Sequence, residues 1–290
     1  MDFRQRLKEG PLFLDGAMGS MLQRYGLDTG QASDMQNLIN GKAVVEIHQQ
    51  YIDAGADILT ANTFGAYALN HYNADKIIEA AVNHMKEAIA NSNANGRKLM
   101  ALDMGPTGQL LEPYGDLTFE DCYDVFLQAA QAGAKAGVDL ILIETMTDLQ
   151  EMKAAVLAAK TTGLPVIASM TFDKSERTMM GVDLPSMVAL LESLEVDVLG
   201  MNCGYGPELY ETLLPKLIEH TRLPVLVQPN AGLPEMIDGK VHYPMTAEDF
   251  AKSMAKMADI ARNAGNEILL GGCCGTTPDH IKGMIALCRC

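Results

Sequence analysis

Asp139-Leu140-Ile141-Leu142-Ile143-Glu144-Thr145 is the stretch that decides the fold. It is a short run of aliphatic residues without polar alternation, which is typical of a parallel strand covered on both faces. Similar runs recur along the whole chain. The sequence therefore predicts strands at residues 11–16, 57–63, 98–105, 139–145, 165–172, 196–203, 224–231 and 267–274.

The segments between these runs carry apolar residues at three- and four-residue spacing, the pattern of a helix with one buried face. Thr246 and Thr277 suit helix N-caps, and Pro278 suits a first helical position. Strands that alternate with helices favour an α/β fold with a parallel sheet. The predicted helices span residues 43–54, 75–91, 119–136, 149–160, 184–194, 208–220, 247–263 and 278–287.

The turn after the first strand distinguishes between a closed barrel and an open, doubly wound sheet. Asp15-Gly16-Ala17-Met18-Gly19-Ser20 does not fit the G-x-G-x-x-G turn that the open sheet would need. No Pro/Ser-rich linker divides the chain. We therefore expect one domain over residues 1–290, a (β/α)8 TIM barrel with its active site at the C-terminal ends of the strands.

The composition limits the kinds of binding partner and the cellular compartment that we expect for the protein. Of the 290 residues 48% are hydrophobic, and the net charge of -15 predicts neither a nucleic-acid nor an anionic-membrane partner. The N-terminal residues lack the apolar run of a signal peptide, and no stretch has the length of a membrane span. We expect a cytoplasmic protein, in which cysteines are thiols or metal ligands rather than disulfides.

Three cysteines fall at strand ends and are the candidate metal ligands. Cys203 ends one strand, and Cys273 and Cys274 end another, so a barrel would bring all three to its mouth. Three thiolates with an open fourth position are the pattern of a catalytic zinc site. Two other interpretations remain open. The cysteines can be simply small, buried hydrophobic residues, or Cys273 and Cys274 can form a strained disulfide.

The remaining cysteines and the histidines have simpler interpretations. Cys122 lies in a helix and is expected to pack there, while Cys288 and Cys290 end the sequence and their role is open. His280 is expected to point away from the cysteine pair. His48, His84 and His220 lie on helical patterns and are expected on outer faces.

Five motifs follow one another across essentially the whole chain: Asp15–Gly19, Thr60–Gly65, Asn202-Cys203-Gly204, Pro229–Gly232 and Gly271–Pro278. In order and spacing they resemble the homocysteine S-methyltransferase family. Three further stretches, Asp103–Gly108, Glu144-Thr145 and Met170–Asp173, make the chain most similar, within that family, to the homocysteine-binding module of cobalamin-dependent methionine synthase.

The resemblance implies zinc on Cys203, Cys273 and Cys274, with homocysteine as the thiol substrate. It also implies that Glu144 and the turn formed by Asp15, Gly16, Ala17 and Met18 hold the amino-acid end of the substrate. Asn230 is implied as a fourth zinc ligand when substrate is absent. Asn62 and Asn202, at strand ends within these motifs, are further candidates for substrate contact.

The chemistry expected of such a site is activation of the thiol. A free thiol is only a few per cent ionised at neutral pH, and coordination to zinc deprotonates it. Backbone N–H groups of the Asp15–Gly19 turn would hold the substrate carboxylate, and Glu144 would pair with its ammonium.

The methyl donor is left open by the sequence. The leading hypothesis is methylcobalamin on a separate corrinoid protein, or on cobalamin and folate modules of a larger synthase of which this chain is a fragment. The alternatives are betaine, S-methylmethionine or S-adenosylmethionine as donor, and another thiol as acceptor. A betaine site should gather aromatic residues around the quaternary ammonium, and the chain has no Trp. The non-enzymatic alternative is a zinc-binding scaffold subunit.

Overall fold

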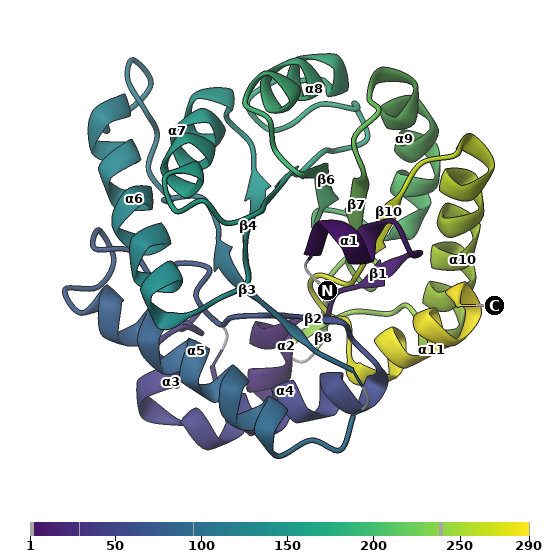
Figure 1. The fold of residues 1–290 in the computed structure, drawn as a ribbon, viewed down its shortest axis with the longest axis horizontal. Coiled ribbons are helices and arrows are strands. Elements are labelled where there is room, and N and C mark those ends of the chain that lie inside the picture. Colours follow the sequence, from purple (N-terminus) through teal and green to yellow (C-terminus); the bar gives the residue numbers. More distant parts are fainter. Residues whose placement is uncertain (1–2, 29, 95, 238–239, 290) are drawn as a thin grey trace.

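Eight parallel strands form the centre of the protein (Figure 1). The computed structural model describes residues 3–28, 30–94, 96–237 and 240–289. The strands run in the order β1-β10-β7-β6-β5-β4-β3-β2, and a bridge between Leu14 and Ile58 brings the two ends of the sheet together. The predicted barrel is confirmed. Its strands are β1 (Leu12–Phe13), β2 (Ile58–Thr60), β3 (Leu99–Met104), β4 (Leu140–Met146), β5 (Val166–Met170), β6 (Val198–Asn202), β7 (Val225–Gln228) and β10 (Ile268–Leu270).

Eight helices surround the strands, each at a predicted position (Figure 1). Thr246 caps its helix through a hydrogen bond from Asp249 N, and Thr277 forms a capping box with His280. None of the helices in the described ranges combines the length and apolarity needed to cross a bilayer. The helices are α4 (Gly41–Ala54), α5 (Ala74–Ala90), α6 (Phe119–Ala136), α7 (Leu149–Lys160), α8 (Leu184–Ser193), α9 (Pro207–His220), α10 (Ala247–Ala264) and α11 (Pro278–Cys288).

Several short elements were not predicted, because none is long enough to show a period. They lie before β1, in the connection from β1 to α4, and in the connection from β7 to α10. They are α1 (Phe3–Leu7), α2 (Met18–Leu22), the 3-10 turn η1 (Gln23–Tyr25), α3 (Gln36–Ile39) and the antiparallel hairpin of β8 (Glu235–Ile237) and β9 (Lys240–His242).

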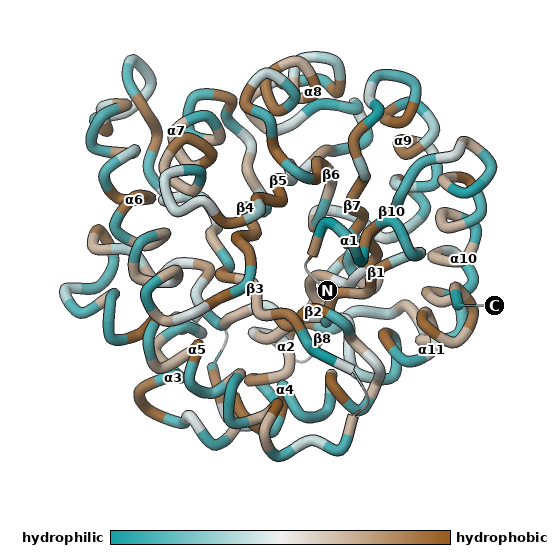
Figure 2. The backbone as a smooth tube through the Cα atoms, in the orientation of Figure 1, coloured by the Kyte–Doolittle hydropathy of each residue, from teal (hydrophilic) through white to brown (hydrophobic). Residues whose placement is uncertain are grey.

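Alternation along the strands separates two apolar layers. On β4, Leu140 and Leu142 pack inside the barrel, whereas Ile141 and Ile143 pack against the surrounding helices. Figure 2 shows the hydrophobic residues concentrated on the strands of the central ring. Continuing the inward positions to the C-terminal ends of β2, β3 and β4 reaches polar residues: Thr60, Asp103 and Glu144. The two-residue alternation of the strands therefore places polar groups above the apolar side chains that fill the barrel interior.

The opposite end of the barrel is held by three aspartates that stand just before strands. One carboxylate oxygen of Asp57, Asp139 and Asp197 accepts a hydrogen bond from a backbone N–H of the neighbouring strand, at 3.2, 2.9 and 2.9 Å respectively. The other oxygen of each binds an arginine, and two of these arginines come from the N-terminal segment. The arginine partners are Arg6 and Arg289 for Asp57, Arg97 for Asp139 and Arg4 for Asp197.

His48 contradicts the expectation of an outer-face residue. Its side chain is fully buried, and neither ring nitrogen has a hydrogen-bond partner among the described residues. The cause is its place on the helix, because His48 lies three or four residues from Val44, Tyr51 and Ile52 and shares the buried face of α4 with them. His84 is half-buried and bonds to the carbonyl of Asn37, and His220 is exposed as expected.

Replacing His48 is expected to remove a pH-dependent loss of stability. Burial, reinforced by the charge of His84, lowers the pKa of His48 to about 3. At a pH below about 6.5, the ordinary pKa of histidine, His48 is therefore protonated in the unfolded chain and remains neutral in the folded chain. Relative to His48→Leu, the wild type should lose about 1.4 kcal/mol of unfolding free energy for each pH unit below 6.5.

Urea unfolding of both proteins between pH 4.5 and pH 7.5 measures this difference. Other titrating groups contribute equally to both proteins, so their effects cancel in the comparison. A difference in unfolding free energy that stays constant with pH would contradict the assignment.

Candidate functional site

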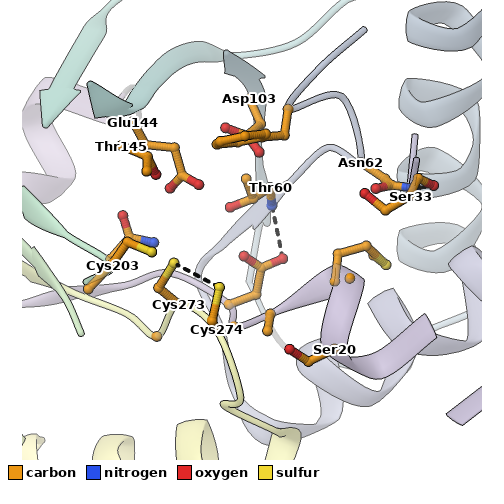
Figure 3. Close-up of a pocket in the computed structure, with 18 of the residues that line it drawn as sticks. Ser20, Ser33, Thr60, Asn62, Asp103, Glu144, Thr145, Cys203, Cys273 and Cys274 are labelled. Carbon is orange, nitrogen blue, oxygen red and sulfur yellow. Dashed lines mark hydrogen bonds between the residues drawn. The ribbon is translucent and has the colours of Figure 1, made fainter. Parts of the chain in front are cut away.

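A cavity of about 220 Å³ opens at the C-terminal ends of the strands (Figure 3). It contains all the predicted substrate-contact residues except Asn202, together with the three predicted zinc ligands. Its lining comprises Asp15, Gly16, Ala17, Met18, Gly19, Ser20, Ser33, Thr60, Ala61, Asn62, Phe64, Asp103, Glu144, Thr145, Cys203, Gln228, Gly272, Cys273 and Cys274.

The three cysteines meet at one side of this cavity. Their sulfur atoms all lie within 4.8 Å of one another, and the sulfurs of Cys273 and Cys274 are 4.0 Å apart, too far for a disulfide. Cys203 follows the last residue of β6 with a left-handed φ of 64° and Gly204 continues at 68°, so the chain bends sharply where the thiol projects. This bend brings a thiol from β6 to the pair that follows β10.

Backbone hydrogen bonds fix the cysteine pair against the end of β7. Cys273 N donates to the carbonyl of Pro229 at 2.9 Å, and the carbonyl of Cys274 accepts from Ala231 N at 2.9 Å. Asn230 lies between these two partners. Its side chain is buried, and its Oδ1 has no hydrogen-bond partner among the described residues. A buried acceptor without a donor is costly, and a cation beside it would satisfy it.

The thiols influence one another's ionisation. Hydrogen bonds from Cys203 and Cys273 lower the pKa of Cys274 to about 3. Hydrogen bonding to Cys203 and Cys274, together with burial, raises the pKa of Cys273 well above its ordinary value. The protein alone therefore supports one thiolate in the cluster. A bound divalent cation would supply the charge needed to ionise all three.

Carboxyl groups face the cysteines across the cavity (Figure 3). Burial is the main cause that raises the pKa of Asp15 to about 7 and that of Glu144 to about 8, and it raises the pKa of Asp103 well above its ordinary value. Asp15 accepts a hydrogen bond from Thr60 N at 2.9 Å, whereas Asp103 Oδ1 has no partner among the described residues. This acidic wall suits a cationic group of a ligand.

Asn202 acts behind the cavity rather than in it. Its Oδ1 accepts from Thr145 N and from Ser169 Oγ, both at 2.8 Å, and its Nδ2 donates to Thr145 Oγ1 at 2.7 Å. Thr145 has a left-handed φ of 62°, a conformation that a β-branched residue adopts only under strain. The amide of Asn202 therefore fixes the backbone next to Glu144.

The remaining predicted contacts differ in their availability to a ligand. Ala17 N already donates to Thr276 Oγ1 at 3.1 Å and is not free for a ligand, whereas the first backbone N–H groups of α2 have no partner within the helix. Asn62 lines the cavity, but its amide nitrogen donates to the carbonyl of Ser33 at 2.7 Å. Asn62 thus holds the connection after β1 against the barrel.

Tyr243 was missed by the sequence reasoning. It follows the β8–β9 hairpin, and the interaction of its hydroxyl with Cys274 helps to lower the pKa of that thiol. The ring packs on Gly275 so closely that a Cβ at that glycine would lie 2.1 Å from Tyr243 Cγ. No local pattern marks this tyrosine, because its position depends on how the hairpin folds over the mouth.

Tyr243→Phe is expected to weaken zinc binding by about tenfold, the lower range for loss of a group that supports a metal ligand. The phenyl ring can keep the packing on Gly275, so only the hydroxyl that supports the Cys274 thiolate is removed. Competition with a chromogenic chelator measures the affinity, and Tyr205→Phe in the neighbouring loop is the control. Equal zinc affinities in all three proteins would contradict the role assigned to the hydroxyl.

The other sulfur and imidazole groups lie outside the cluster. His280 Nε2 lies 3.1 Å from the carbonyl of Met245, and its Nδ1 joins the cap at Thr277, as expected for a residue that is not a metal ligand. Cys122 is a buried, free thiol packed in the core. Cys288 is also buried, on α11, while Cys290 lies outside the described residues.

The fold and the site together define a (β/α)8 barrel with a trio of thiols at its mouth, close enough together to serve as ligands of one metal ion. The profile of the family "Homocysteine S-methyltransferase" matches residues 12–288. The chain belongs to this family, whose members are thiol S-methyltransferases.

Relatives and solved structures agree with this assignment. The chain is 31% identical to methionine synthase from Mycobacterium leprae over 100% of its own length, and 33% identical to that from Mycobacterium tuberculosis over 94%. It spans only 25% and 24% of those two proteins. The metallated homocysteine methyltransferase MmuM from Escherichia coli superimposes with a TM-score of 0.81 at 25% identity, with 98% of each chain covered.

Proposed function

We propose that the chain is a zinc-dependent S-methyltransferase that activates homocysteine as a thiolate and converts it to methionine. The observation that carries this proposal is the meeting of three cysteine sulfurs within 4.8 Å at the edge of a cavity lined by carboxyl groups. A thiolate trio suits zinc, and it leaves a coordination position for a substrate sulfur. The unpartnered Oδ1 of Asn230 supports this residue as the ligand that occupies the position when substrate is absent.

Different residues of the site would bind the metal and the amino-acid group of the substrate. Bound zinc would supply one piece of chemistry, the stabilisation of the substrate sulfur as a thiolate at neutral pH. Cys203, Cys273 and Cys274 would hold the ion through sulfur, a soft donor that leaves the substrate sulfur electron-rich. Glu144 would accept hydrogen bonds from the substrate ammonium.

The other end of the amino acid would meet the turn after β1. Backbone N–H groups in the first turn of α2 would donate to the substrate carboxylate, since Ala17 N is already bonded to Thr276. Asp15 and Asp103 would offer further carboxyl oxygens to the ammonium as hydrogen-bond acceptors. In the overall reaction the methyl carbon moves from the donor to sulfur, and the thiol proton is released.

We further propose that the methyl group comes from methylcobalamin carried by a separate corrinoid protein or by other modules of a larger synthase. The similarity to two methionine synthases that are about four times as long supports this choice of donor. Among the residues that the structure describes, Phe64 is the only aromatic one that lines the cavity, so no aromatic cage for a quaternary ammonium is seen there, and this disfavours betaine.

The test is methionine formation by purified chain loaded with zinc. L-homocysteine is supplied with methylcobalamin, betaine, S-methylmethionine or S-adenosylmethionine in separate reactions. Methionine is expected with methylcobalamin alone, lost after chelation and restored by zinc. Turnover with another donor would refute the corrinoid part, whereas full turnover by metal-free protein would refute the zinc mechanism.

A further inference from the structure

Gln228 is a buried amide in the wall of the cavity, and the chemistry described so far makes no use of it. The residue is only 3% exposed and lines the cavity together with the three cysteines. Its Oε1 has no hydrogen-bond partner among the described residues, and none of them accepts a hydrogen bond from its Nε2. A buried amide without partners is costly, so the contents of the cavity have to supply them.

Gln228 lies at the base of the cysteine trio. It ends β7, the strand between β6, which precedes Cys203, and β10, which precedes Cys273. Its carbonyl accepts a hydrogen bond from Cys203 N at 3.0 Å, and the carbonyl of Pro229 accepts one from Cys273 N at 2.9 Å. The side chain of Gln228 therefore reaches the cavity between the two strands that deliver the thiols.

Gly271, at the end of β10, makes room for this amide. A Cβ at Gly271 would lie 3.1 Å from Gln228 Cγ, 3.2 Å from Gln228 Nε2 and 2.9 Å from Leu14 Cβ. The φ of Gly271 is not left-handed, so the backbone conformation does not require a glycine there. The side chain of Gln228 thus lies across the chain two residues before Cys273, in a space that the missing Cβ leaves open.

The cavity offers few nitrogen donors to a ligand atom that accepts hydrogen bonds. Among the described residues that line it, only Asn62 and Gln228 have a side-chain N–H group. The amide nitrogen of Asn62 already donates to the carbonyl of Ser33 at 2.7 Å. Gln228 Nε2 is therefore the side-chain nitrogen of the lining that remains available to such an atom.

We propose that Gln228 contacts the sulfur of the substrate, with its Nε2 donating a hydrogen bond to the thiolate. This inference rests on the proposed function, which places a substrate sulfur beside the three cysteines. Four thiolates around one divalent ion carry more negative charge than the ion neutralises, so an N–H donor stabilises the bound substrate. The same hydrogen bond withdraws electron density from the sulfur, so Gln228 favours binding of the substrate rather than the rate of methyl transfer.

Two other roles explain the amide less well. A contact with the substrate ammonium would use Oε1, but carboxyl groups on other strands already face that group, and Gln228 lies at the sulfur end of the cavity. A purely structural role would require partners within the protein, and the amide has none among the described residues. An apolar side chain would fill the same space at a lower cost.

Gln228→Leu and Gln228→Glu test the proposal. Leucine removes both polar atoms, whereas glutamate keeps the shape and an acceptor but removes the donor. Binding of L-homocysteine to the zinc-loaded proteins is measured by calorimetry, and both variants should bind at least about tenfold more weakly than the wild type. The loss should persist with 4-mercaptobutyrate, which has the thiol but no amino group. In turnover it should appear in KM and not in kcat.

A second measurement distinguishes this role from a structural one. Unfolding of the metal-free proteins by urea is compared for Gln228→Leu and for Asn37→Leu, the matched control. Asn37 is a buried amide outside the cavity lining, and its Nδ2 donates to the carbonyls of Asp34 and Asn62 at 2.8 and 2.7 Å. Asn37→Leu should lower the free energy of unfolding, whereas Gln228→Leu should preserve or raise it, because it removes a buried amide without partners.

Each contrary outcome has a distinct meaning. Wild-type affinity for homocysteine in Gln228→Glu would overturn the role of the donor, and a loss that disappears with 4-mercaptobutyrate would assign the amide to the ammonium. A free energy of unfolding lowered as much as in Asn37→Leu would assign Gln228 to structure. Homocysteine binding by the wild type that does not depend on zinc would instead refute the proposed function, and this inference with it.

Discussion

Cys273→Ala is expected to abolish zinc binding and methyl transfer together. Apparent zinc-binding free energies of about 10–16 kcal/mol are shared among four ligands, so one lost thiolate costs roughly 3 kcal/mol or more. That corresponds to a loss of affinity greater than about 100-fold. Cys203→Ala and Cys274→Ala should behave alike, because the three sulfurs lie within 4.8 Å of one another and none is remote from the others.

Zinc content after dialysis and methionine formation are the two measurements for these variants. Cys122→Ala is the matched control, since this buried thiol lies on α6 in the core, outside the cluster. It should retain full zinc content. A Cys273→Ala protein that is free of metal and methylates homocysteine at the wild-type rate would show that the cysteines do not activate the substrate.

Glu144→Gln is expected to raise the KM for homocysteine by about 100-fold and to change zinc content little. The substitution keeps the shape of the side chain but removes the charge that would pair with the substrate ammonium. Hydrogen bonds to charged groups contribute about 1.5–3 kcal/mol, which sets the size of the effect. The effect should vanish with 4-mercaptobutyrate, which has the same carbon chain and thiol but no amino group.

The same substitution should change the pH dependence of kcat/KM. Burial raises the pKa of Glu144 to about 8, so this group is protonated in the free site at neutral pH and must lose its proton to pair with an ammonium. In the wild type kcat/KM should fall as the pH drops below 8, and in Glu144→Gln this limb should be absent. Glu151→Gln is the control, because Glu151 is also buried but bonds to Thr107 outside the cavity. An unchanged pH profile in Glu144→Gln would contradict the assignment.

The regular part of the fold could be read from the sequence because its pattern is local. Runs such as 139–145 and the helical segments between them each identify one element, and repetition of the unit leaves few arrangements other than a barrel. The cysteines were placed correctly for the same reason, since every strand delivers its last residues to one face. Their convergence follows from topology alone.

What the sequence did not reveal depends on contacts between distant segments. His48 is an exception, because the spacing of Val44, Tyr51 and Ile52 already places it on the buried face of α4 and only its polar side chain suggested an outer position. Tyr243 reaches Cys274 only because a short hairpin folds over the mouth. Asn202 was expected to contact the substrate, but its side chain binds Thr145 and Ser169, on β4 and β5. The alternation of residues along a strand predicts that a side chain points inward, and it does not predict which neighbouring strand the side chain binds.

The amide of Asn202 also has a consequence for the choice of substrate. It joins the end of β6, one residue before Cys203, to the strained residue after Glu144. With the proposed roles of these two residues, it fixes the span between the atom that holds the sulfur and the atom that holds the nitrogen of the substrate. A fixed distance of this kind selects for the length of the carbon chain. An amino-thiol shorter by one methylene would lose either its contact through sulfur or its contact through the ammonium. Discrimination between homocysteine and cysteine would then depend on Asn202, a residue that contacts neither the metal site nor the substrate.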